Sequence, residues 1–363
     1  MNQEGFMDND LPEECYQAIQ SLIRATPTVL VGSGFSCGYN LPGMSELGSH
    51  LIKTIPDYLT NDSIRKTWET SLERIRDNLE NGLNTISLGS DGRNEIIDGL
   101  RKETARLILE RTKIAEEIIQ SQSSHQSLPL PRLLRKLFHG APQNAESIAV
   151  ITTNYDTLVE LFCDIASLPI DTGFSGYRYR KPRKENLFLT QYKQSYVIDG
   201  RKITKKHQPS LTVRIYKPHG SITWNKTENG PVEVTNDTSC IDKAIVIPGP
   251  SKYEDALTNT LFDSIRTEMN AVLSKTSSLL CLGFGFNDVH LQGVIKNRLR
   301  DGMPTLILTR GLTPSIESLI RDHKHIIAIS KKDDGSECYF NGEKYYSKKS
   351  LWELDPFLIE FIE

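Results

Sequence analysis

The sequence has no long hydrophobic run and no excess of charge of one sign. No apolar stretch of its 363 residues approaches the roughly 20 residues that a membrane-spanning helix needs. The N-terminus is acidic and lacks the basic-then-apolar order of a signal peptide. Lys and Arg (43) nearly balance Asp and Glu (46), so no overall field would hold a polyanion. We therefore expect a cytoplasmic protein whose main ligand is not nucleic acid.

The six cysteines are spread along the chain, and none forms a Cys-x-x-Cys pair. Zinc ribbons need closely paired cysteines, and small secreted domains need a disulfide framework. The spacing therefore predicts reduced thiols and no metal site. The chain also contains no internal repeat and no low-complexity tract.

Short β-branched runs alternate with amphipathic helical segments through most of the chain. Strands are predicted at residues 26–31, 147–153, 211–218, 243–249, 277–286, 304–309 and 326–330. Helices are predicted at residues 12–24, after residue 154, and from near Glu254, Asn287 and Thr313. This alternation predicts an α/β fold with a Rossmann-like, doubly wound and mostly parallel sheet.

Three further segments complete the predicted organisation. Residues from about 52 to 122 are polar and helical, with breaks expected at Gly82 and at residues 90–93, and predict a helical insertion. A basic insertion spans about 176–210, where residues 187–192 and 195–199 are expected to pair as a hairpin. Asn341-Gly342 predicts another hairpin, followed by a helix at 351–362. We expect residues 311–363 to form a C-terminal α/β extension packed on a domain of residues 1–310.

Two glycine turns each follow a predicted strand. The first reads Val31-Gly32-Ser33-Gly34-Phe35-Ser36, and the second contains Gly283, Gly285, Asn287 and Asp288. Glycine permits positive φ and lets backbone N–H groups approach a phosphate. The alternative is an ordinary tight turn, because the third glycine of the dinucleotide fingerprint is absent. In the second turn, Asn287 and Asp288 could equally cap the next helix.

Two polar segments follow other strands. Thr153, Asn154 and Asp156 offer a hydroxyl, an amide and a carboxylate together, which suits ribose hydroxyls and a water, although helix capping by Asn154 is an alternative. His219 stands between Pro218 and Gly220, and histidine is the side chain best poised to move protons near neutral pH. The carboxyl ends of the strands in such a sheet gather at one edge. We therefore expect Asn154 and His219 to share a crevice with the glycine turns.

The segments GSGFS, TTNYD, KPHGS and GFGFND, in this order, resemble the sirtuin-like domains of bacterial NAD-hydrolysing proteins, many of which are anti-phage defence effectors. The resemblance spans residues 28 to about 300. Two further segments, TGFSGYRYR and IVIPGPSKY, resemble the sirtuin-like subunit that partners a HerA-type ATPase. The length without a fused domain is also similar to that subunit. The resemblance implies that residues 1–310 form a catalytic domain that binds NAD⁺ as its substrate.

Carried over to this sequence, the resemblance places Asn154 and Asp156 at the nicotinamide-ribose end, with His219 as the acid/base or ribose-orienting residue. The implied nucleotide-binding residues are Gly32, Ser33, Gly34, Phe35, Ser36, Thr153, Gly220, Gly283, Gly285, Asn287 and Asp288. The first turn would cradle phosphate, and the second would contact the adenosine half. Two positions depart from the family pattern: Ser33 stands where alanine is usual, and Thr153 stands where glutamine is usual.

The protein-deacylating sirtuins carry a four-cysteine zinc module and a Phe-Arg pair after the glycine turn, and this sequence has neither. The resemblance therefore implies water as the acceptor, and nicotinamide and ADP-ribose as the products. A sensor that binds NAD or ADP-ribose without turnover is the alternative, and a protein deacylase is a further one. Neither NAD⁺ nor NADP⁺ is indicated over the other. The implied partners are further copies of the chain, a HerA-type ATPase subunit or a phage-derived trigger.

Residues 178–207 contain ten Lys or Arg side chains against Glu185 and Asp199. A solvated hairpin explains such a run, because exposed charge runs are common. The other interpretation is a docking surface for an acidic partner or nucleic acid, centred on Arg180, Lys181 and Arg183.

Overall fold

The computed structural model describes residues 11–86, 90–122, 124–199, 202–237, 239, 242–247, 260–287 and 289–363. Its centre is a nine-stranded sheet of order β16-β15-β14-β13-β12-β1-β2-β8-β3. The parallel strands are β1 (Thr28–Val31), β2 (Ser147–Thr152), β3 (Ile170–Asp171), β8 (Thr212–Tyr216), β12 (Leu279–Leu282), β13 (Thr305–Thr309) and β14 (Ile326–Lys332). The central order β8-β2-β1-β12-β13-β14 is that of the doubly wound nucleotide-binding fold, which confirms the predicted fold class.

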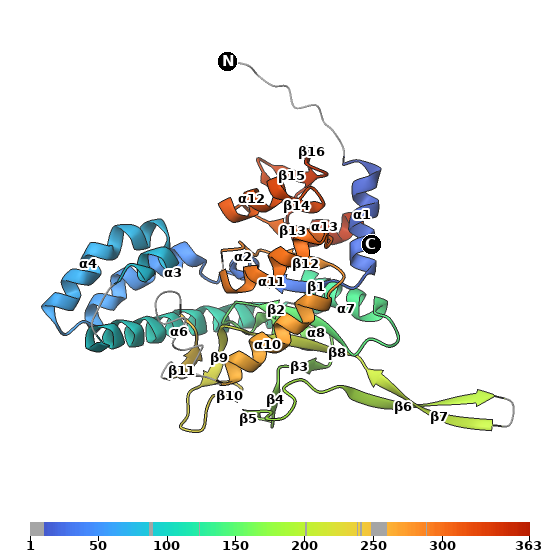
Figure 1. Ribbon diagram of the computed structural model, residues 1–363, viewed down its shortest axis with the longest axis horizontal. Coiled ribbons are helices and arrows are strands. Elements are labelled where there is room, and N and C mark those ends of the chain that lie inside the picture. The colour runs from blue at the N-terminus through green and yellow to red at the C-terminus, as the bar shows by residue number, and fades with distance from the viewer. Residues whose placement is uncertain are drawn as a thin grey trace, which may run out of the picture.

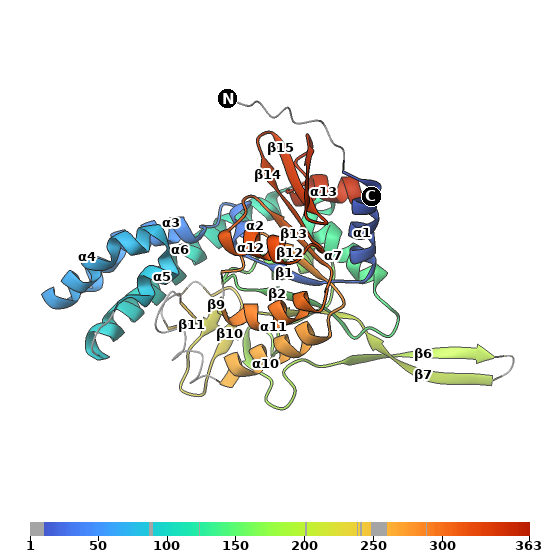
Figure 2. The ribbon, with the colours of Figure 1, turned by 45° about the horizontal axis from the view of Figure 1, so that its top comes forward.

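Two antiparallel strands, β15 (Gly335–Phe340) and β16 (Glu343–Ser347), extend one edge of this sheet. Their turn contains Asn341 at φ 53° and Gly342 at φ 83°. Two successive positive φ angles are what a two-residue hairpin turn requires, so the predicted Asn-Gly hairpin is confirmed. Figure 2 shows these strands continuing the central sheet beyond β14.

Helices cover both faces of the central sheet (Figure 1). One face packs against α1 (Glu13–Arg24), α7 (Pro129–Gly140), α8 (Leu158–Ile165) and α13 (Leu354–Phe361), and a short helix η2 (His125–Ser127) precedes α7. The other face packs against α10 (Thr260–Lys275), α11 (Val289–Arg300) and α12 (Pro314–Asp322). Along β1, Val29 and Val31 join the first core and Leu30 joins the second, as strand alternation requires. The helix start expected near Glu254 lies outside the described residues.

The predicted helical insertion forms a separate lobe with its own core, which extends to one side in Figure 1. It consists of α3 (Met44–Thr54), η1 (Ile55–Tyr58), α4 (Asp62–Asp77), α5 (Leu79–Asn84) and α6 (Ser90–Ser121). The lobe therefore begins at Met44, earlier than the expected residue 52. No helix in the described part of the chain is both long enough and apolar enough to cross a membrane.

The helix breaks inside the lobe differ from those expected. Chain direction changes at Asn78, whose side chain accepts a hydrogen bond from Asn81 N and caps α5. Gly82, expected in a loop, lies inside α5, where a Cβ would overlap the backbone of Ile75. This glycine therefore allows α4 and α5 to approach closely, and it does not end a helix.

A second sheet, order β11-β9-β10-β5-β4, is antiparallel. Its strands are β4 (Phe174–Ser175), β5 (Tyr179–Pro182), β9 (Gly220–Asn225), β10 (Val232–Val234) and β11 (Lys243–Ile245). The run at 243–249 does contain a strand, β11, but that strand belongs to this sheet and not to the parallel one. Its continuation reaches the lobe, because Ile245 and Ile247 join the lobe core.

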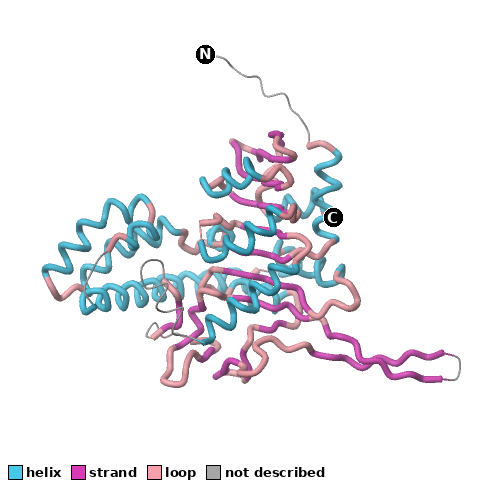
Figure 3. Tube along the Cα trace, in the orientation of Figure 1, coloured by secondary structure: helices cyan, strands magenta, loops and turns pink. Residues whose placement is uncertain are grey.

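The basic insertion contains a long hairpin of β6 (Gln191–Asp199) and β7 (Lys202–Ser210), which projects away from the body in Figure 3. The expected pairing of residues 187–192 with 195–199 is wrong, because residues 191–199 form one strand with nine partners in β7. Arg180 and Arg183, on which the docking-surface interpretation is centred, form ion pairs with Glu233 and Asp171. The first pair joins β5 to β10 within the second sheet, and the second pair joins the residue after β5 to β3 of the central sheet.

Candidate functional site

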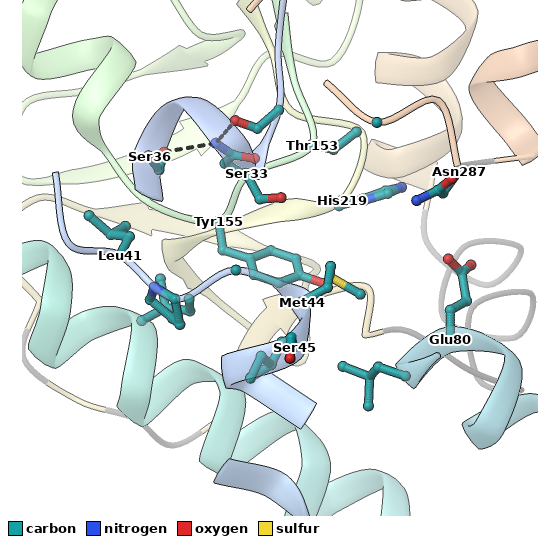
Figure 4. Close-up of a pocket in the computed structure, with 18 of the residues that line it drawn as sticks. Ser33, Ser36, Leu41, Met44, Ser45, Glu80, Thr153, Tyr155, His219 and Asn287 are labelled. Atoms are coloured by element: carbon teal, nitrogen blue, oxygen red, sulfur yellow. Dashed lines mark hydrogen bonds between the residues drawn. The ribbon is translucent and has the colours of Figure 1, made fainter. Parts of the chain in front are cut away.

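A cavity of about 380 Å³ lies between the carboxyl edge of the central sheet and the helical lobe. This volume is within the usual range for small-molecule sites. The predicted site residues that line it are Gly32, Ser33, Ser36, Thr153, Asn154, Asp156, His219, Gly285 and Asn287. Figure 4 shows Thr153, His219 and Asn287 on the sheet side, with Met44, Ser45 and Glu80 opposite. The ends of β1, β2, β8 and β12 thus meet at one cavity, as their shared edge requires.

Three other predicted residues, Gly34, Phe35 and Gly283, border a different hollow behind α2 (Ser33–Cys37). Gly34 N donates a hydrogen bond to Gly283 O at 2.9 Å. Gly283 has φ +57°, and a Cβ there would overlap Phe35 N. The two glycine turns therefore pack against each other, which by itself accounts for glycine at these positions.

Gly220 also lies away from the cavity lining. It has φ +83°, and a Cβ would overlap the carbonyl oxygen of Ala244. Its glycine lets β9 approach β11 directly after His219. Asp288, the remaining predicted contact, lies outside the described residues.

Asn154 is held in place by two hydrogen bonds from its amide nitrogen. Nδ2 donates to Gly32 O at 3.0 Å and to Ser36 Oγ at 2.8 Å, the latter drawn in Figure 4. The side chain therefore joins the end of β2 to the turn after β1. Because both bonds use the nitrogen, Oδ1 is the atom that Asn154 can offer to a ligand. Capping, the alternative for Asn154, does not apply, since the N-cap residue of α8 is Thr157.

Asp156 supports this arrangement from behind. Its Oδ2 accepts a hydrogen bond from Ser36 Oγ at 2.8 Å, and its Oδ1 accepts from Leu158 N at 3.1 Å at the start of α8. The residue is only 4% exposed. Burial raises the pKa of the Asp156 carboxyl, although Lys217 and the Ser36 hydroxyl oppose the shift. A chain of hydrogen bonds thus runs from Asn154 through Ser36 to Asp156.

A buried ammonium group lies beneath the same segment. Lys217, at the end of β8, is 2% exposed; its Nζ donates to the backbone oxygen of Asp156 and to Glu160 Oε1, the latter at 2.8 Å. Burial also raises the pKa of nearby Glu116. The sequence interpretation overlooked this cluster. The lysine at the end of the predicted strand, in the segment RIYKP, could have indicated it.

His219 lines the cavity beyond Asn154, and the backbone around it is fixed on both sides. Gly220 N donates to Lys217 O at 3.0 Å, closing the turn, and Val246 N donates to His219 O at 2.9 Å. Tyr155, another lining residue, donates its hydroxyl to Val246 O at 2.7 Å. The segment after β11 therefore connects the backbone of His219 to the residue that follows Asn154.

The second glycine turn is held by the start of α12. Gly285 O accepts a hydrogen bond from Thr313 Oγ1 at 2.6 Å, and Asn287 Oδ1 accepts one from Ser315 Oγ at 3.2 Å. Asn287 is exposed at the cavity rim. Its amide nitrogen is directed to the side where His219 lies in Figure 4.

The wall contributed by the helical lobe was not predicted. Its members come from four helices: Met44, Ser45, Leu47, Ile75, Arg76, Asp77, Asn78, Leu79, Glu80 and Ile108. The sequence shows these segments to be helical, but no local pattern tells which turn of which helix faces the sheet. In the described part of the chain, no group of three His, Cys, Asp or Glu side chains could hold a metal ion.

The fold and the cavity define an α/β protein of Rossmann-like topology with a candidate ligand site at the carboxyl edge of its sheet. The chain belongs to the SIR2-like domain family, whose pattern matches residues 148–329, half of its length. This match confirms the sirtuin-like resemblance. It includes the segments of Asn154, His219 and Gly285, while the first glycine turn and the lobe lie outside it. No curated protein matches the chain.

Proposed function

We propose that this protein binds NAD⁺ in the 380 Å³ cavity and hydrolyses its nicotinamide-ribose bond, giving nicotinamide and ADP-ribose. The observation that supports this most strongly is that Asn154 and His219 line one cavity together with the first glycine turn. Sirtuin-like domains use NAD⁺, so membership of the family favours the same nucleotide here.

Cleavage of the nicotinamide-ribose bond requires few catalytic groups from the protein. Nicotinamide in NAD⁺ leaves as a neutral molecule from a cationic ring, so no strong acid is required. The developing ribosyl oxocarbenium must instead be positioned and stabilised while water is controlled. Few polar groups in a preorganised cavity suffice for this.

In this proposal Asn154 Oδ1 accepts a hydrogen bond from a ribose hydroxyl or from the attacking water. Both hydrogen bonds of Nδ2 fix the orientation of the amide before the ligand arrives. Water would add to the sugar carbon as the bond to nicotinamide breaks, and its proton would pass to the solvent. Asp156 acts as a positioning residue, because its buried carboxyl accepts a hydrogen bond from Ser36, which in turn holds Asn154.

His219 would orient or deprotonate the partner hydroxyl of the same ribose. Its partly buried side chain and fixed backbone suit this role. Ser33 and Thr153 are hydroxyl side chains of the lining that can contact the phosphates or the ribose. The helix α2 spans only five residues, so backbone and hydroxyl contacts matter more here than a helix dipole.

The resemblance extends the proposal to a biological role: depletion of NAD⁺ in anti-phage defence. Unrestrained NAD⁺ loss would poison the cell, so activity would depend on self-assembly, a HerA-type ATPase partner or a phage-derived signal. Measurement of cellular NAD⁺ after phage infection, with and without an Asn154→Ala variant, tests this role.

The biochemical test is incubation of the full chain with NAD⁺ and chromatographic detection of nicotinamide. We expect Asn154→Ala and His219→Ala to lower the rate by at least about a hundredfold while ADP-ribose binding persists. Asn297→Ala and His139→Ala make the same changes at exposed positions away from the cavity and should leave the rate unchanged.

Undiminished cleavage by both site variants would refute the residue assignment. Tight NAD⁺ binding without turnover, under conditions that include candidate activators, would instead indicate a nucleotide sensor. Release of nicotinamide only with acetylated peptide present would indicate a deacylase.

A further inference from the structure

Two cysteine thiols from opposite ends of the chain lie in contact within the first core. Cys15 belongs to α1 and Cys338 to β15, and they are 323 positions apart in the sequence. Their Sγ atoms are 4.0 Å apart, and the residues are 0% and 1% exposed. Both are free thiols in the structure. The proposed function gives this pair no role.

The fold holds both cysteines in place. β15 pairs with β14 on one side, where Ile329 lies opposite Cys338, and with β16 on the other side, where Tyr345 lies opposite it. Beside Cys15 on α1, Tyr16 donates its hydroxyl to Glu360 Oε1 of α13 at 2.7 Å. Strand pairing and helix packing therefore keep the two sulfurs close to each other.

The contact is close to the geometry of a disulfide. A disulfide has an S–S bond of about 2.05 Å, so the two sulfurs must approach each other by about 2 Å. Small rotations about the Cα–Cβ bonds of the two residues can supply this shift. A small oxidant can reach the pair through local opening of β16, because β16 is an edge strand and its Tyr345 is only partly buried.

The contact also makes the two thiols chemically different. The hydrogen bond with Cys338 lowers the pKa of the Cys15 thiol against the effect of burial, whereas the same bond and burial both raise the pKa of Cys338. Cys15 therefore ionises first, and the thiolate is the form that attacks an oxidant. For Cys163 and Cys281, two other buried thiols, burial raises the pKa.

We propose that Cys15 and Cys338 form a disulfide when the protein meets a peroxide, and that this bond cross-links the two ends of the chain. The Cys15 thiolate attacks one oxygen of hydrogen peroxide, which releases hydroxide and leaves a sulfenic acid. The Cys338 sulfur then attacks the Cys15 sulfur, the S–O bond breaks, and the thiol proton leaves with the hydroxyl group as water. The hydroxide takes up the proton that Cys15 released. Two thiols are thereby oxidised, and the peroxide is reduced to water.

The expected consequence of this bond is a more stable fold. A cross-link stabilises mainly by restricting the unfolded chain, and the restriction grows with the length of the loop that it closes. Because the two cysteines are 323 positions apart, the loop contains the glycine turns and the whole lobe. We expect oxidation to raise the melting temperature by about 3–5 °C. This inference does not depend on the proposed NAD⁺ cleavage.

The test is treatment of the purified full chain with hydrogen peroxide, followed by peptide mapping without reduction and by thermal unfolding. We expect a peptide pair joined through Cys15 and Cys338, together with a higher melting temperature that dithiothreitol reverses. Cys15→Ala and Cys338→Ala should lose both the linked peptides and the rise in melting temperature. The peptide map of the wild type requires no substitution, so it decides the chemistry even if a variant does not fold.

Cys163→Ala and Cys281→Ala are the matched controls, because each removes another buried thiol. Both should keep the linked peptides and the rise in melting temperature. Each variant is compared with its own reduced form, which separates the effect of the cross-link from the cost of the substitution.

Absence of the linked peptides at a peroxide concentration that oxidises the exposed thiol of Cys37 would overturn the proposal. A linked pair that melts at the temperature of the reduced protein would refute the cross-linking effect. An equal rise in melting temperature in Cys15→Ala would show that the stabilisation comes from oxidation elsewhere in the chain, and it would also overturn the proposal.

Discussion

Replacement of Ser36 by alanine tests whether the hydrogen-bond chain behind Asn154 shapes the site. Ser36 is 3% exposed, and its hydroxyl accepts from Asn154 Nδ2 and donates to Asp156 Oδ2, each at 2.8 Å. Ser36→Ala removes both bonds and leaves a buried carboxylate oxygen without its donor. Asn154 keeps only the bond to Gly32 O.

The expected cost can be worked from these two bonds. A hydrogen bond to a charged group contributes about 1.5–3 kcal/mol, and one between neutral groups about 1 kcal/mol. We therefore expect unfolding free energy to fall by about 3 kcal/mol, which still leaves a folded protein if its stability lies in the usual range of about 5–15 kcal/mol. The loosened amide should lower kcat for NAD⁺ cleavage by about tenfold, with a smaller change in KM.

Urea unfolding and steady-state nicotinamide release measure the two effects. Ser49→Ala is the control, because Ser49 is exposed on α3 and its hydroxyl bonds only to Ser45 O. We expect that control to change stability by less than about 0.5 kcal/mol. A Ser36→Ala protein as stable and as active as the control would refute the reasoning that this hydroxyl organises the site.

Three further predictions concern charge and backbone. Burial raises the folded-state pKa of Asp156, so the folded chain holds this proton more tightly than the unfolded chain, where the pKa is about 3.9. Wild-type stability should therefore fall relative to Asp156→Asn as pH rises from about 4 to 7, and parallel denaturation midpoints would contradict this. Lys217→Met should cost about 3 kcal/mol in denaturant unfolding, and the added change Glu160→Gln should restore part of it; a double variant no more stable than the single one would argue against the ion pair. Gly283→Ala, at φ +57° beside Phe35 N, should destabilise the fold, whereas Gly293→Ala on α11, where nothing lies within 4 Å, should raise the melting temperature.

The central sheet could be predicted because its strands are strongly apolar and regularly spaced. Runs such as TVLV, SIAVIT and TLILT are buried on both faces, so each shows as a continuous apolar segment. The parallel direction of most strands followed from the alternation of strands and helices. The small antiparallel sheet was not foreseen, because its strands have two to six residues and two of them, β4 and β5, lack a long apolar run.

The pairing within the hairpin of β6 and β7 was predicted wrongly for a different reason. Its strands face water, with Tyr192, Tyr196 and Ile203 all more than 60% exposed. Register in a strand is specified by burial of one face, and none of the hairpin residues whose burial is described belongs to the three core clusters. The apolar pattern on which the expected pairing relied therefore carried no information about which residues pair.

The residues of the candidate site also differ in whether the sequence could predict them. Residues at strand ends, such as Asn154 and His219, could be brought together from sequence because parallel topology forces the carboxyl ends onto one edge. Glu80 and Met44 could not, because the orientation of an inserted lobe depends on contacts far along the chain, such as those of Ile245 and Ile247 with its core.

In the proposed function, the two walls of the cavity have separate roles. In the proposed reaction, the sheet edge supplies Asn154 and His219, which would act on the sugar carbon of the nicotinamide ribose. The lobe supplies the opposite wall, so changes there can alter which nucleotide is held without moving the groups that act on the bond. Variants of Ser36 should therefore change the rate for every nucleotide that binds.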